Sequence, residues 1–66
     1  MNDIIIFKSF ELGQKAFLTG KKRMPVENKE ILDFAKSQSC SERINMFSAF
    51  IRGWDTEKTK FWSHVC

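Results

Sequence analysis

The chain has 66 residues, a net charge of +3 and 42% hydrophobic residues, among them seven Phe and two Trp. A domain of this size buries only about 60% of its unfolded surface, so we expect a single small domain over residues 1–66. No apolar run approaches the roughly 18 residues of a membrane span, and the first apolar stretch, residues 4–7, lacks a preceding basic region. The two cysteines, Cys40 and Cys66, are too sparse for a disulfide framework. We therefore predict no signal peptide, no membrane anchor and a cytoplasmic protein.

The excess positive charge lies in the N-terminal part of the chain. Residues 1–26 carry five Lys or Arg against two Asp or Glu, whereas residues 27–66 carry six of each kind. A local basic cluster favours an anionic partner, nucleic acid above all, because binding releases counterions. Simple solubilisation by surface lysines is the competing explanation.

The first predicted helix covers about residues 4–19. Asn2 or Asp3 can cap it, and its apolar residues recur at helical spacing. The β-branched run over residues 4–6 leaves a short strand as an alternative. Gly20 suits the left-handed position that ends a helix, and the cations after it suit the exposed carbonyl groups there.

Two further helices are predicted after this turn. Pro25 suits the first position of a helix over about residues 25–36. Ser41 can then cap a third helix over about residues 42–63, whose apolar stripe comprises Ile44, Phe47, Phe50, Ile51 and Trp54. After Trp54 this helix either continues, straight or with a kink near residues 54–56, or restarts from an Asp55 cap. The predicted fold class is all-α, with three helices in one domain.

Three small residues share one face of the first helix, because Gly13, Ala16 and Gly20 lie at positions i, i+3 and i+7. Such a flat strip lets another helix or an aromatic ring approach closely, and Gly53 permits the same from the opposite side. We predict that the first and third helices pack as an antiparallel clasp. In this clasp Trp54 covers the strip, and the basic residues 21–23 lie beside it.

The small strip is part of a longer pattern. Gly13-x-x-Ala16-x-x-x-Gly20 is followed by a basic stretch, by Pro25 and later by aromatic-x-x-Gly-Trp at residues 50–54. Over about residues 9–57, this order and spacing resembles the ribosome modulation factor family and its short bacterial and phage relatives. The resemblance implies a pair of helices that binds small-subunit ribosomal RNA through basic and aromatic residues and silences ribosomes in slowly growing cells, the state called ribosome hibernation.

The candidate nucleic-acid contacts are the cations near this corner, namely Lys15, Lys21, Lys22, Arg23 and Arg52. For residues 21–23, a charge complement to the end of the first helix is the competing explanation. Phe50 and Trp54 fall on the periodic face and are predicted to belong to the core. Phe61 and Trp62 are adjacent, so one of them is predicted to be exposed and available to a partner or a nucleic-acid base.

Catalysis and metal binding have little support in the sequence. The single histidine, His64, has no evident nucleophile or orienting group, so we predict that the chain is not an enzyme. The segment from Gly13 to Lys21 fails as a Walker motif because no Ser or Thr follows the lysine. A metal site would need both cysteines, His64 and a fourth ligand, so neither a metal nor a cofactor is expected.

The leading hypothesis is therefore a ribosome- or RNA-associated regulator of translation that acts by occupancy. The alternative is a small inhibitor or adaptor of a host protein, of the kind that phages and plasmids encode, with residues 61–62 as its hot spot. A third interpretation is a homodimer that buries its exposed aromatic residues. Salt separates the first two hypotheses, because phosphate contacts weaken steeply as salt rises and an aromatic protein interface does not.

Overall fold

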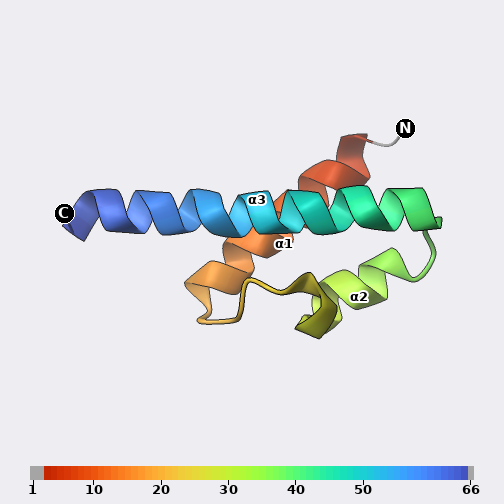
Figure 1. The fold of residues 1–66 in the computed structure, drawn as a ribbon, viewed down its shortest axis with the longest axis horizontal. Coiled ribbons are helices and arrows are strands. Elements are labelled where there is room, and N and C mark those ends of the chain that lie inside the picture. Colours follow the sequence, from red (N-terminus) through yellow and green to blue (C-terminus); the bar gives the residue numbers. More distant parts are fainter. Residues whose placement is uncertain (1–2, 66) are drawn as a thin grey trace.

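The computed structural model describes the chain over residues 3–65, and its side chains as far as Ser63. The elements are α1 (Asp3–Leu18), one turn of 3-10 helix η1 (Pro25–Glu27), α2 (Lys29–Ala35) and α3 (Cys40–Val65) (Figure 1). The predicted all-α class with three helices is confirmed, and residues 4–6 are helical. The alternative cap Asn2 lies outside the described residues. The 26 residues of α3 span roughly 39 Å at about 1.5 Å per residue, which accounts for the longest dimension of 40 Å.

Helix α1 ends as the sequence predicts. The Lys21 N–H donates to the Ala16 carbonyl at 2.7 Å, and the Gly20 N–H donates to the Phe17 carbonyl at 3.1 Å. These two bonds close a Schellman motif, in which the residue after the helix must adopt positive φ. Gly20 has φ 75°, a conformation that glycine adopts without strain.

The predicted helix over residues 25–36 is wrong at its start, because the segment divides into η1 and α2. Asn28 separates the two pieces with an extended backbone, at φ −104° and ψ 114°. Its side-chain oxygen accepts the Ile31 N–H at 3.2 Å and so caps α2 in place of Pro25. At the other end of α2, the Arg43 guanidinium donates to the carbonyl groups of Ala35 and Lys36 at 3.0 and 3.1 Å.

Helix α3 starts two residues earlier than predicted. Ser39, rather than Ser41, provides the side-chain oxygen that accepts the Glu42 N–H, at 3.4 Å. The helix then continues without interruption to Val65, so it neither kinks near residues 54–56 nor restarts at Asp55 (Figure 1).

Helices α1 and α3 pack together as predicted, but the expected antiparallel direction is wrong. Both helices run in the same direction along the molecule, and α2, which lies between them in the sequence, runs in the opposite direction (Figure 1). Accordingly, Phe7 near the start of α1 lines a groove with Asn45 near the start of α3. Further along both helices, the Gln14 side-chain amide donates to Glu57 at 3.0 Å. The helices are parallel because α2 returns the chain to the starting end before α3 begins.

Two glycines let the backbones of α1 and α3 touch. A Cβ atom on Gly13 would lie 2.7 Å from the carbonyl carbon of Phe50, and closer still to its oxygen. A Cβ atom on Gly53 would lie 2.9 Å from the carbonyl carbon of Phe10 in the same way. Because each glycine faces a carbonyl group of the other helix, no larger residue fits at either position without a shift of the backbone.

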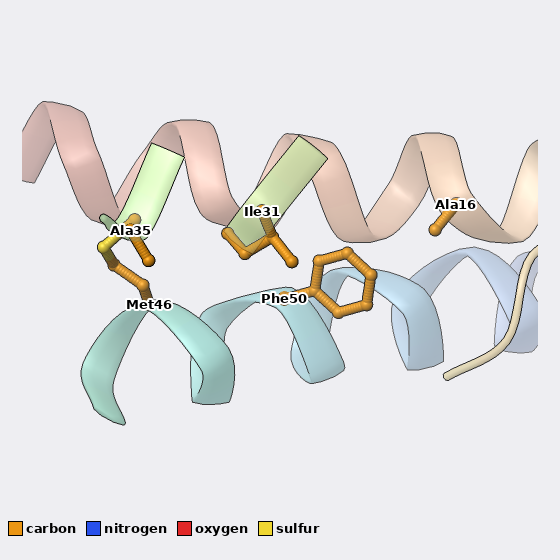
Figure 2. Packing of buried hydrophobic residues seen from close by; sticks show 5 residues of the cluster. All are labelled: Ala16, Ile31, Ala35, Met46 and Phe50. Atoms are coloured by element: carbon orange, nitrogen blue, oxygen red, sulfur yellow. The ribbon is translucent and has the colours of Figure 1, made fainter. Parts of the chain in front are cut away.

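The core lies where α2 covers the α1–α3 pair. Its buried residues are Ala16, Ile31, Ala35, Met46 and Phe50. Figure 2 shows Met46 beside Ala35, and the Phe50 ring below Ile31. Phe50 is fully buried, which confirms its predicted core position. Trp54 is only half-buried and packs against the edge of the core.

Candidate functional site

The basic residues 21–23, which we call the basic loop, are fastened to α3 by two contacts. The Trp54 indole Nε1–H donates to the Lys21 carbonyl at 3.0 Å. The Arg23 guanidinium donates to both carboxylate oxygens of Asp55, from Nε at 2.8 Å and from Nη2 at 2.9 Å. The Schellman turn at Gly20 directs the chain toward α3, so the position of the loop is determined at both ends.

The pair of Arg23 and Asp55 is charged across the neutral pH range. The hydrogen bond from Arg23 lowers the pKa of Asp55 below its ordinary value of 3.8; partial burial opposes this shift, and the charges of Arg23 and Lys58 add to it. The same hydrogen bond and charge raise the pKa of Arg23. Both side chains are about half exposed, so solvent screens the attraction strongly.

Two other predicted contact residues also face carboxylates. Lys22 lies 3.5 Å from Glu27, and Lys15 lies 3.0 Å from Glu30 on α2. All four side chains are exposed, and such pairs contribute only about 0–1 kcal/mol. A phosphate group can therefore replace the carboxylate at little cost.

An aromatic cluster adjoins the basic loop. The Phe17 ring meets the Trp54 ring edge-on at a centroid distance of 5.1 Å, and its centroid lies 6.0 Å from that of Phe61. The Lys58 ammonium lies 5.6 Å from the centroid of Trp54, within the range of a cation–π contact. Phe61 and Trp62 are 51% and 52% exposed, so both of these rings, rather than one, are available at the surface.

The prediction that Trp54 covers the whole small strip is wrong at its two glycines. Phe50, one turn earlier, lies at the crossing of the helices, so its backbone faces Gly13. Ala16 belongs to the core, whereas Gly20 has open space where a Cβ would stand. Trp54 instead packs against Phe17 and the basic loop. The strip thus serves the packing of helices over its first two residues only.

Basic and aromatic groups meet at one end of the molecule. Asp55, which holds Arg23, also lines a shallow depression of about 650 Å³ together with Lys58, Thr59, Trp62 and Ser63. We call residues 21–23, Lys58, Phe61 and Trp62 the basic–aromatic surface. Arg52, predicted to join the basic loop, lines instead a different groove, which Asp3 and Phe7 also line.

Two residues at the basic–aromatic surface, Lys58 and Asp55, were not predicted from the sequence as site residues. Lys58 lies one helical turn after Trp54, and this i,i+4 spacing is a signal that could have identified the pair. Asp55 contacts a residue 32 positions away, for which no local pattern exists.

The described residues provide neither a cluster of metal ligands nor a membrane-spanning helix. No group of three or more His, Cys, Asp or Glu side chains is placed there to hold a metal ion. The predicted candidates Cys66 and the His64 side chain lie outside the described part. No described helix combines the length and the apolar character needed to cross a bilayer.

Comparison of the chain with known protein families, with curated proteins and with solved structures finds no match. The geometry of the site itself therefore carries the functional argument.

Proposed function

We propose that the chain is a small RNA-binding protein that modulates translation by occupying a site on the ribosome, as a ribosome modulation factor-like regulator would. The observation that carries this proposal is the attachment of the basic loop to α3 beside the exposed aromatic residues. The Trp54–Lys21 hydrogen bond and the Arg23–Asp55 pair provide that attachment.

The chemistry of RNA fits such a surface. Proteins bind single-stranded or looped RNA by combining cations for the phosphates with aromatic rings on which bases stack. The basic–aromatic surface supplies three cations in the loop, a fourth in Lys58, and the half-exposed rings of Phe61 and Trp62. The pattern of Gly13, Ala16, Gly20 and Gly53–Trp54, which resembles the ribosome modulation factor family, supports the same partner.

The ion pair between Arg23 and Asp55 competes with RNA, because the carboxylate and a phosphate would use the same guanidinium. Arg23 must leave Asp55, or share it, before it can hold a phosphate. Asp55→Asn removes this competing charge, so it should tighten RNA binding, whereas Arg23→Gln should weaken it. Opposite effects of the two variants would identify Arg23 as a phosphate contact rather than a purely structural residue.

The main test replaces residues 21–23 by Gln and measures the affinity for small ribosomal subunits and for a short polyuridylate at several salt concentrations. Each lost phosphate contact should flatten the plot of log affinity against log salt by roughly 0.7–0.9, so the triple variant should lose up to about 2–3 units of slope. A matched control replaces three exposed lysines elsewhere by Gln, namely Lys8, Lys29 and Lys36. Equal losses in both triple variants would mean that only net charge matters and would contradict the proposal.

A second candidate function is favoured by the exposure of two adjacent large rings. Phe61 and Trp62 present their aromatic surface at the end of α3, and exposed aromatic pairs are typical hot spots of protein interfaces. If Trp62→Ala abolishes partner capture, while the triple Gln variant and added salt leave it unchanged, the chain is an inhibitor or adaptor of a host protein.

A further inference from the structure

A second surface lies on a face of the α1–α3 pair that α2 does not cover. It is an open groove of about 810 Å³ between the first half of α1 and the first half of α3. Ile6 and Phe10 from α1 and Ala49 from α3 form its apolar floor. None of these residues belongs to the basic–aromatic surface.

Exposed apolar side chains also lie on the α1 side of this groove. Phe7 lines the groove and is 60% exposed, and Ile4, one turn before it, is 67% exposed. The exposed Phe7 ring can insert into an apolar groove, and the same patch provides such a groove, so the patch has both a protruding ring (a knob) and a hollow (a hole). Large apolar side chains exposed beside an apolar groove are typical of an interaction site.

The charges at the groove indicate which partner fits. Asp3 comes from α1 and Arg52 from α3, and neither belongs to any ion pair found among the described residues. We propose that the groove binds a second copy of this chain about a twofold axis, with Asp3 of each copy facing Arg52 of the partner subunit. A twofold interface uses the same patch twice, so every feature of the patch must find its complement within that patch: an acid needs a base, and a knob needs a hole. This patch has all four.

The size of the molecule is compatible with such a dimer. A stable interface covers on the order of 800 Å² per partner, roughly one sixth of the 4708 Å² accessible surface of this chain. Each copy keeps its basic–aromatic surface outside the groove, so the dimer does not depend on the proposed RNA binding and would offer two RNA contacts at once.

The first test measures the oligomeric state of the full chain by sedimentation equilibrium over a range of concentrations. Wild type is expected to dimerise and Phe7→Lys to remain monomeric. Leu18→Lys is the matched control, because Leu18 is also exposed on α1 but lies outside the groove, and it should dimerise like wild type. A wild-type chain that stays monomeric up to about 1 mM would overturn the proposal. So would equal behaviour of the two lysine variants with unchanged circular dichroism.

The second test addresses the charge pairing. Asp3→Arg and Arg52→Glu each place like charges together twice in a dimer, so each variant alone should dimerise roughly tenfold or more weakly. Mixing the two variants restores opposite charges at both contacts, so the mixture should form heterodimers close to wild-type strength. If Asp3→Arg unwinds the start of α1, Arg52→Glu still tests the contact, because a glutamate there would face Asp3 of the partner subunit. Wild-type dimerisation of Arg52→Glu alone, or the absence of heterodimers from folded variants, would refute the pairing.

Discussion

The contact between the backbones of α1 and α3 predicts an unusual response to Gly→Ala substitution inside a helix. Alanine normally stabilises a helix by about 0.5–1 kcal/mol relative to glycine. At Gly13, however, the added Cβ would lie 2.7 Å from the carbonyl carbon of Phe50, whereas ordinary contact begins at 3.4 Å. The obstacle is backbone rather than a flexible side chain, so the two helices must move apart.

The cost follows from that movement. Overpacking in a well-packed core costs about 1–3 kcal/mol, which exceeds the helix-propensity gain of alanine. We expect Gly13→Ala and Gly53→Ala each to destabilise the fold by about 1–2 kcal/mol, a fall in Tm of roughly 4–16 °C for a domain of this size. One separation of the helices relieves both clashes, so the double variant should cost less than the sum of the single ones.

Thermal unfolding followed by circular dichroism measures these effects. Gly20→Asn is the control, because Gly20 has open space around it and asparagine tolerates the positive φ there. Its Tm should therefore fall much less. An unchanged or raised Tm in Gly13→Ala, or fully additive effects in the double variant, would refute the close contact between the helices.

Three further predictions concern the loop and the helix ends. Because the pKa of Asp55 is lowered in the folded state, its pair with Arg23 stabilises the fold above the ordinary Asp pKa of 3.8 and loses that effect as pH falls below it. The Tm difference between wild type and Arg23→Gln should therefore be present near neutral pH and vanish in acid. Trp54→Phe keeps an aromatic ring but removes the Nε1–H donor to Lys21, so it should cost about 1 kcal/mol and increase hydrogen exchange in the basic loop. Asn28→Ala removes the cap of α2 and should lower stability by about 1 kcal/mol, as measured by urea unfolding.

The local features of the fold could be predicted from the sequence because their causes are local. The helical period identified α1 and α3, and the glycine followed by cations identified the end of α1 at Gly20. The division between η1 and α2 was missed because Pro25 was taken as the start of one continuous helix, although Asn28 is a residue type that favours the N-cap position, where its side chain accepts the Ile31 N–H.

The direction in which the helices pack against each other could not be predicted from local sequence patterns. The small strip predicted a close helix contact and Gly13 makes one, but the strip carries no information about direction. Direction depends on α2, which brings the chain back before α3 starts. For the same reason, the Arg23–Asp55 pair depends on the finished fold, so the sequence indicated only that cations would gather near residue 22.

The parallel course of α1 and α3 has a practical consequence for fusion proteins. Figure 1 places the start of α1 and the end of α3 at opposite ends of the long axis. A fluorescent domain or affinity tag joined before Asp3 would stand beside the groove, whereas one joined after α3 would stand beside Trp62 and Ser63. Each fusion should obstruct one surface and leave the other accessible. Two fusion proteins, one tagged at each end, can therefore separate self-association from RNA capture inside cells without altering any residue of the chain.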